Sequence, residues 1–499
     1  MARSFPRFAV NRTTTHAAAR LLCGHLAALC PAAAVVLLLP QQVDAAEWTV
    51  KPSLSLTENY SDNIRRAPRG NEQSDLITQI SPGLNLTGTG PKLTFSTIYQ
   101  MQNLFYAKNK QSDSTRHNLS TNAHTELVNN QLFLDGIASV SQQNTGTLGP
   151  QTLNNFNITA NRAEVRSLSI SPYLRHRFQG WANSEVRYTH GVVSTNASGL
   201  ANSQTDSVLL KLDSGYSFTT LRWGMHYNNQ KSSYGNALQT INSDTYAGNL
   251  GYMITPRFTL NASAGHEKFN YVSVARPPQG PHYSAGFTWA PSQRTNIDAS
   301  IGHRFFGQTF ALNARHRSRK TTWNLGYSEE VTTTQAQFQA NAGLPAPILP
   351  GSSNFLSNQV FLQKRLTASV TMTGHSNTLN FNLFDSSRNA QTSQAQNLAL
   401  LGAANLALGN KSKQLGGNAS WVRQISPYTS THLTLGYIKN NFPALNITNN
   451  DKNIQLGIHS KLQPDLGYSV SLRHNQYHST LPNSNSRENA ITAALLMQF

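Results

Sequence analysis

Apolar and polar side chains alternate along much of the chain from Trp48 to Phe499. In the segments 93–101, 246–254 and 295–303, most of the residues at every second position are apolar or aromatic. A period of two belongs to a β-strand with one apolar and one polar face. Runs of about ten residues exceed the five or six of an average globular strand and match the roughly 9–11 residues with which a tilted strand spans a bilayer. The pattern predicts an all-β protein whose strands cross a membrane.

The connections between these segments also alternate in length. Short turns rich in Gly, Pro and Asn, such as 88–91 and 463–465, are interspersed with longer polar segments at 142–163, 194–205, 332–354 and 386–410. Short periplasmic turns and long extracellular loops are typical of a bacterial outer-membrane barrel. Such a sheet has to close on itself, because lipid offers no partner for the backbone groups of an open edge. We therefore expect a single transmembrane antiparallel β-barrel.

The number of strands follows from a parity argument. If 360–362 and 370–372 were separate strands, the count would be 23, and the two ends of the barrel domain would lie on opposite sides of the membrane. One apolar phase runs through the whole of 360–372, with Lys364 as its only charged member. We therefore expect one strand here, a turn at 374–377, and about 22 strands in all, within a range of 18–24.

The composition excludes several other classes of protein. Charged residues make up 12% of the 499 residues and hydrophobic residues 38%, against about 25% and 45–50% in ordinary soluble domains. A helical soluble enzyme needs more Lys and Glu on its exposed faces. A helical transporter needs several long apolar runs, and 17 Tyr, 21 Phe and 6 Trp argue against disorder.

The first 45 residues have the layout of a cleaved signal peptide. Several arginines precede an apolar stretch at 21–39, and small residues near Ala45 suit a signal peptidase. The two cysteines, Cys23 and Cys30, both fall in this segment. We therefore expect domains 1–45 (signal peptide) and 46–499 (barrel), a location in the outer membrane of a Gram-negative cell, and a mature chain without thiols, disulfides or cofactors.

The end of the chain carries a candidate assembly signal. Leu495, Met497 and the terminal Phe499 continue the apolar phase of the last strand. This ending resembles the C-terminal strand that the barrel assembly machinery of the outer membrane recognises. The expected partners are that machinery together with outer-membrane lipid and lipopolysaccharide.

The residues that alternate with the apolar positions are expected to face the inner wall of the barrel. The candidate luminal cations are Arg175, Arg187, Lys211, Arg304, Arg315 and Arg473, with Arg177 and Lys461 on the same phase. The fewer acids on this phase are Glu185, Asp213 and Glu267. Two interpretations stay open: a basic pore that attracts anions such as acidic exopolysaccharide, or arginines paired with carboxylates that stiffen the wall. Nucleic acid is not an expected partner, because the basic residues are spread along strands although the net charge is +18.

No catalytic, cofactor-binding or metal site is predicted. The sequence contains no His-Glu-x-x-His, phosphate-binding loop or Gly-x-Ser-x-Gly motif, so we do not expect an enzyme. His303, His316 and His375 lie near strand ends, which leaves a barrel-wall hydrolase as a lesser alternative.

Several short strand–turn pieces, in order along the chain, resemble outer-membrane proteins associated with PEP-CTERM/exosortase systems. They are 48–52 (WTVKP) with 60–64 (YSDNI), 80–84 (ISPGL), 171–175 (SPYLR), 289–295 (WAPSQRT) with 302–307 (GHRFFG), and 421–429 (WVRQISPYT). The resemblance implies a barrel encoded with exopolysaccharide biosynthesis and protein-sorting genes, but no site residues.

The leading hypothesis is therefore an outer-membrane barrel that supports exopolysaccharide biosynthesis or export, as a conduit with a basic lumen. The alternative is a general or anion-selective diffusion porin. TonB-dependent receptors and autotransporters are not favoured, because the first expected strand begins at Trp48 and leaves no room for a plug domain or a passenger.

Overall fold

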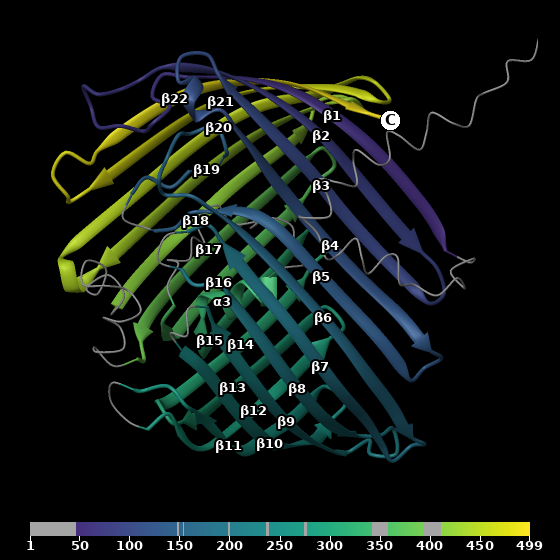
Figure 1. The fold of residues 1–499 in the computed structure, drawn as a ribbon. Helices are drawn as coiled ribbons and strands as arrows, with labels where there is room; N and C mark the ends of the chain where they lie inside the picture. Colours follow the sequence, from purple (N-terminus) through teal and green to yellow (C-terminus); the bar gives the residue numbers. More distant parts are fainter. Residues whose placement is uncertain are drawn as a thin grey trace, which may run out of the picture. The chain divides into compact units, whose positions relative to one another are not determined.

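The computed structural model describes residues 46–146, 149–152, 154–197, 200–235, 239–273, 277–341, 358–392 and 411–499. The unit Trp48–Phe499 is built on one sheet of 22 strands, every adjacent pair of which is antiparallel where its register is known (Figure 1). The predicted signal peptide, residues 1–45, lies outside the described residues and stays a prediction.

The strands are long, between 10 and 17 residues, as a membrane-crossing strand requires. Their bounds are β1 Glu47–Ser61, β2 Asp75–Thr89, β3 Leu93–Tyr106, β4 Ser114–Val128, β5 Leu132–Gln143, β6 Ala163–Phe178, β7 Ala182–Thr195, β8 Ser203–Ser214, β9 Leu221–Tyr234, β10 Gln239–Thr255, β11 Phe258–Phe269, β12 Gln279–Ser292, β13 Thr295–Arg304, β14 Gly307–Arg317, β15 Thr321–Thr333, β16 Val360–Thr373, β17 Asn377–Ala390, β18 Lys411–Gln424, β19 Thr429–Phe442, β20 Ile447–Gln463, β21 Leu466–Ser479 and β22 Ser486–Gln498.

Each strand pairs with its neighbours in the chain, and the sheet closes where β1 meets β22. The closing ladder runs from Ser53 opposite Gln498 to Ser61 opposite Ala490. This closed sheet confirms the predicted barrel and its 22 strands. Val360–Thr373 is a single strand, β16, and β17 begins at Asn377, as expected for an even number of strands.

The two ends of the barrel differ in the length of their connections. At the turn end, even-numbered strands lead into short turns, the tightest of which comprise two residues, such as Pro256 and Arg257. At the loop end, odd-numbered strands lead into longer segments such as 144–162 and 334–359. Two details differ from expectation. The loop after β17 starts at 391 rather than 386, because hydrogen bonding to β18 continues to Asn389. The loop-end connection between β13 and β14 comprises only Phe305 and Phe306.

The described residues contain little helix. The α-helix α3 (Thr334–Asn341) follows β15, and the 3-10 turns η1 (Lys110–Ser112) and η3 (Pro443–Leu445) lie in loops. None of the helices in the described part of the chain has the length and apolar character to cross a bilayer.

The alternation places apolar side chains on the outer face of the sheet. Exposed apolar residues recur at every second position, as in Leu250, Tyr252 and Ile254 of β10 or Ile454, Leu456 and Ile458 of β20. The opposite phase carries polar side chains, many of them buried under the loops. Apolar groups facing lipid and polar groups facing a lumen are the arrangement that a membrane barrel requires.

Lys364, the charged exception in the apolar phase of β16, has an ion-pair partner. In the ladder between β15 and β16 it lies opposite Glu329, and its Nζ is 3.2 Å from Glu329 Oε2. The Tyr327 hydroxyl donates to Glu329 Oε1 at 2.6 Å. The Glu329 side chain is only 1% exposed. A lysine is tolerated on the lipid-facing phase here because it neutralises a buried carboxylate near the loop end.

We predict that K364M lowers the free energy of unfolding by about 1–3 kcal/mol, because Glu329 loses its counter-charge. The double variant E329L/K364M should recover most of this loss, since it removes both charges. Urea unfolding in lipid vesicles, followed by tryptophan fluorescence, measures the effect. K231M is the control, because Lys231 is an exposed lysine on β9 that lies opposite Asp206 in the ladder but forms no ion pair within 4.0 Å among the described residues. An equal loss in K364M and K231M would contradict the prediction.

Candidate functional site: the lumen and its inward-folded loops

Helix α3 crosses the lumen. It follows β15 in the chain but contacts β6 and β7, eight or more strands away around the barrel, and Figure 1 shows it within the ring of strands. Its contact on β7 is Gly191, where a Cβ would overlap the side-chain amide of Gln339. The absence of a side chain at Gly191 therefore lets the helix lie against the wall.

Hydrogen bonds hold α3 in this position. Gln335 Nε2 donates to Asn358 Oδ1 at 3.0 Å and to the carbonyl of Ala201, in the β7–β8 loop, at 3.4 Å. Arg388 Nη2, on the luminal face of β17, donates to Gln337 Oε1 at 3.1 Å. The helix thus joins two opposite parts of the wall and narrows the lumen between them.

Two further loops fold over the lumen near its loop end, on the side of β20–β22. In the β1–β2 loop, Arg66 reaches Asp451 of β20, with Nη2 3.2 Å from Oδ1. The β5–β6 loop meets the same carboxylate, because Gln151 N donates to Asp451 Oδ2 at 3.1 Å. Both side chains of the Arg66–Asp451 pair are almost fully buried, so the two loops form a packed layer rather than a loose cover.

Glu488 of β22 is the second anchor of this layer. It is fully buried and accepts hydrogen bonds from Ser61 Oγ at 2.9 Å, Asn157 Nδ2 at 2.8 Å and Asn475 Nδ2 at 2.9 Å. Arg473 Nη2 lies 3.1 Å from Glu488 Oε1. The structure therefore places Arg473, a predicted luminal cation, in a buried ion pair under the loops.

An apolar core fills the space beneath these loops. It consists of Ile64, Ile77, Leu104 and Tyr106, with Phe156 and Ile158 of the β5–β6 loop packed against it. In the same loop, burial, together with the nearby charge of Arg116, lowers the pKa of Arg162 to about 9. Apolar packing of this kind gives the layer a stability of its own.

Arg175 and Arg187, two of the predicted cations, belong to an ion-pair network on the luminal face of β5–β7. Glu185 accepts from both, at 2.8 Å from Arg175 Nε and 2.9 Å from Arg187 Nε. Arg187 Nη1 also donates to Asp135 at 2.7 Å, and its guanidinium carbon lies 3.7 Å from the centre of the Tyr173 ring. The charges of these arginines are largely balanced within the wall.

Of the remaining predicted cations, Lys211 and Arg304 have a carboxylate partner, and Arg315 has none among the described residues. Lys211 Nζ lies 2.8 Å from Asp213, and Arg304 Nε donates to Glu267 at 3.1 Å. Arg315 of β14 faces the lumen between Asn296 and Asn324, is exposed, and has no described carboxylate within 4.0 Å. The predicted cations do share one face. Their partners lie at different places, because Asp213 is two residues from Lys211 on β8, whereas Glu267 is on β11, two strands from Arg304.

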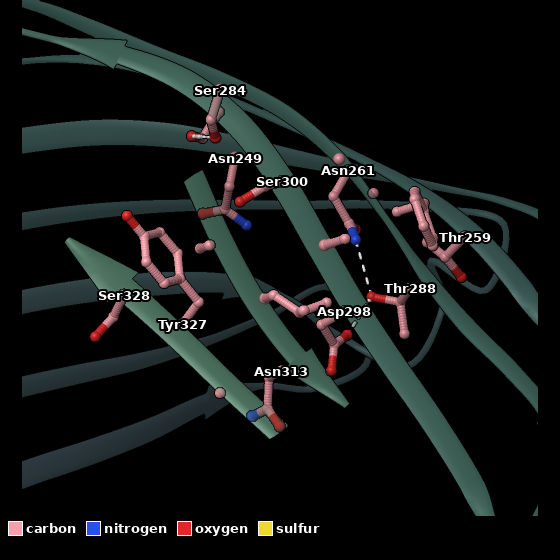
Figure 2. A pocket seen from close by; sticks show the side chains of 18 of the residues that line it. Asn249, Thr259, Asn261, Ser284, Thr288, Asp298, Ser300, Asn313, Tyr327 and Ser328 are labelled. Carbon is pink, nitrogen blue, oxygen red and sulfur yellow. Dashed lines mark hydrogen bonds between the residues drawn. The ribbon is translucent and has the colours of Figure 1, made fainter. Parts of the chain in front are cut away.

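A hollow on the luminal side of β9–β16 was not predicted from the sequence. Its volume is about 970 Å³, and its luminal lining consists mostly of Gly, Ser, Thr and Asn, with Arg222, Arg365 and Asp298 as the charged members. Figure 2 shows Asn261 donating to Thr288, at 2.9 Å, while Thr288 Oγ1 donates to Asp298 Oδ1 at 2.7 Å. The signal was present in the inner phase, where small and amide side chains replace larger ones.

Glycine makes part of this hollow possible. Gly286 of β12 faces the lumen, and a Cβ there would lie 2.7 Å from the Ser300 Cβ and closer still to the carbonyl of Ala299. A side chain at Gly286 would therefore overlap the neighbouring strand β13. Its absence leaves this part of the lumen open.

The predicted histidines lie on the other face. His303 stacks on Tyr283 with ring centres 5.7 Å apart, and His316 Nδ1 is 2.8 Å from Thr295 Oγ1, both on the lipid-facing phase. His375 lies in the turn between β16 and β17. Within the described residues, no group of three or more His, Cys, Asp or Glu side chains is arranged to hold a metal ion.

Comparison with known proteins gives similarity of fold alone. No protein family and no curated protein matches the chain. The siderophore receptor PirA from Pseudomonas aeruginosa is similar with a TM-score of 0.45 and 10% identity, over 90% of this chain and 80% of that one. A mutant ferric enterobactin receptor (PfeA) from the same organism, in complex with enterobactin, gives 0.49 and 10%, over 91% and 82%. The P. aeruginosa protein OccK2 gives 0.35 and 8%, over 90% and 98%.

The location follows from the structure itself. A closed sheet with an apolar outer face and a polar lumen satisfies every backbone group within lipid. Closed barrels of this type with short turns at one end and longer loops at the other are outer-membrane barrels of Gram-negative bacteria. The protein is therefore an outer-membrane β-barrel.

We predict that R187Q lowers the free energy of unfolding by about 1–2 kcal/mol, because Glu185 and Asp135 lose a shared donor. R315Q should change it by less than about 0.5 kcal/mol, since that guanidinium has no carboxylate partner. Urea titration of both variants in the same vesicles makes the comparison. If R315Q were as damaging as R187Q, the ion-pair network would not explain the effect.

Proposed function

We propose that the protein is a porin-like channel for small polar solutes, saccharides in class, with a lumen narrowed by α3. The observation that carries this proposal is the hollow of about 970 Å³, whose luminal lining consists mostly of Gly, Ser, Thr and Asn. Amides and hydroxyls both donate and accept hydrogen bonds, so they replace the water around a hydroxyl-rich solute without holding it tightly.

The balance of charge on the wall supports a neutral rather than strongly charged cargo. A pore selects ions when its wall presents charges of one sign. Here Arg175, Arg187 and Lys211 are paired with carboxylates, as are Arg304 and Arg473. Arg315, together with Arg222 and Arg365 of the hollow, leaves a modest preference for anions.

The closeness of Gly191 and Gln339 offers a direct test of the role of α3. We predict that G191C/Q339C, oxidised to a disulfide, fixes α3 to β7 and holds single-channel conductance in planar bilayers at its narrow value, without gating transitions. Reduction with dithiothreitol should restore transitions to a wider state. The two single-cysteine variants are the controls, since neither can form the bond.

Two outcomes would contradict the proposal. One is a conductance that is the same in oxidised and reduced protein. The other is liposome swelling that shows no permeation by mono- or disaccharides, which would exclude the proposed solute class.

The second candidate is support of exopolysaccharide biosynthesis or export. It is supported by the ordered strand–turn motifs, such as 289–295 with 302–307, and by a barrel of 22 strands, a size at which side chains alone do not fill the lumen. In this case the inward loops have to move before a polymer passes. A hydrolase on the barrel wall is not proposed, because His303 and His316 face lipid.

We predict for this second candidate that deletion of the gene lowers secreted polysaccharide by at least about fivefold while the polymer accumulates in the cell. Wild-type gene supplied in trans is the control and should restore secretion. An unchanged amount of secreted polymer in the deletion strain would exclude the export role and leave the porin proposal intact.

A further inference from the structure

Four cations lie on the outer face of β18–β22 near the loop end. Lys413 of β18, Lys439 of β19, Lys452 of β20 and Arg487 of β22 form what we call the cation patch, and all four are exposed. Their position is set by the ladder. Lys439 lies opposite Leu415 and Asn450, Lys452 opposite Tyr437 and Gln476, and Arg487 opposite Gln476.

The patch lies directly beyond the apolar belt. Lys452 is two residues from Ile454, Lys439 two from Tyr437, and Lys413 two from Leu415, so each cation shares the outward phase of an exposed apolar residue. Neighbouring strands are about 4.8 Å apart. The cations therefore lie at the level where lipid headgroups begin. Lys413, Lys439 and Lys452 are on three successive strands, and Arg487 is on β22, separated from β20 by β21 (Figure 1).

No carboxylate lies on the outward phase of the strands that carry the four cations. The outward phase of the described β18–β22 contains no Asp or Glu. The nearest outward carboxylates are Asp385 of β17, opposite Leu415 in the ladder, and Asp62, which accepts two hydrogen bonds from Asn489 at 2.7 Å. None of the four cations has a carboxylate within 4.0 Å among the described residues.

Other outward cations on the strands near the loop end have a carboxylate beside or opposite them. Lys231 lies opposite Asp206 and Lys268 opposite Asp244 in the ladder. Arg166 lies 2.7 Å from Glu164, and His190 lies 2.8 Å from Asp206. The unpaired cations are thus concentrated on one sector of the barrel, and they call for negative charge from outside the chain.

A hollow of about 430 Å³ lies beside the patch on the same face. Its floor is aliphatic, with Ile454, Leu456, Leu472 and Ile491. Its rim is polar and includes Asp62, whose carboxylate accepts two hydrogen bonds from Asn489. At the rim, His474 Nδ1 lies 2.7 Å from Asn489 Oδ1. An apolar depression next to unpaired cations, at the edge of the lipid-facing belt, matches an acyl chain attached to an anionic headgroup.

We propose that this sector binds a phosphorylated, multi-acylated glycolipid of the outer leaflet, of the lipid A type. One acyl chain occupies the hollow, and the phosphates lie against Lys452 and Arg487, with Lys439 and Lys413 extending the contact. Guanidinium and ammonium groups form charge-assisted hydrogen bonds with phosphate, and long cationic side chains reach outward from the apolar belt to the headgroups. The site is independent of the lumen and of any solute that passes through it.

The test uses the full barrel, refolded in detergent free of lipopolysaccharide, with bisphosphorylated lipid A as the probe in native mass spectrometry. We expect K452Q/R487Q to bind roughly tenfold more weakly than the wild type, in line with the contribution of basic residues near an anionic surface. K452R/R487K should bind within about twofold, since it preserves the charges.

K231Q/K268Q is the matched control, because Lys231 and Lys268 are exposed and outward-facing near the loop end on β9 and β11. It should bind like the wild type. L472W, which fills the hollow, tests the acyl chain independently of charge and should also weaken binding. Heat-modifiable migration on gels shows that each variant is folded.

Three outcomes would overturn the proposal. The first is equal loss in K452Q/R487Q and K231Q/K268Q. The second is equal binding of lipid A from which both phosphates have been removed. The third is equal affinity for phosphatidylglycerol, which would make the sector a general anionic-lipid surface without preference for a glycolipid.

Discussion

The closed ladder of backbone hydrogen bonds is the constraint on which the rest of the structure depends. In hydrocarbon an unpaired N–H or C=O costs several kcal/mol, so all strands have to pair on both sides. Closure between β1 and β22 meets this requirement. Once the ring is closed, alternate side chains are forced outward to lipid or inward to water, and every other feature of the protein is arranged on one of these two faces.

Sequence analysis could predict the fold because the alternation of apolar and polar residues is itself the signature of the barrel. The continuous phase through Val360–Thr373 gave the correct strand count, since the residues of one strand that face lipid keep the same phase from end to end. Lys364 was recognised as an exception, but its partner, Glu329, is 35 positions away and is brought opposite only by the ladder. Pattern along one strand carries no information on what lies across it.

The lumen was harder to predict for the same reason. The alternation of residues was enough to predict that Arg175 and Arg187 face the lumen. Their pairing with Glu185 and Asp135 depends on the register of β5, β6 and β7, which the alternation does not give. The inward course of α3 and of the β1–β2 and β5–β6 loops has no periodic signal, because loops lack a repeating phase. Their docking rests on individual contacts such as Arg66 with Asp451 and Gly191 with Gln339.

The junction between β1 and β22 has a consequence for biogenesis. The hydrogen bond from Ser61 to Glu488 joins residues 427 positions apart in the sequence. The barrel therefore cannot close until nearly the entire polypeptide has reached the membrane. Contacts of such long sequence separation form late and slowly. Until then, the first strand has to be sheltered from wrong partners, and a polypeptide shortened by its last hairpin would leave two unsatisfied edges in the bilayer rather than a smaller working cylinder.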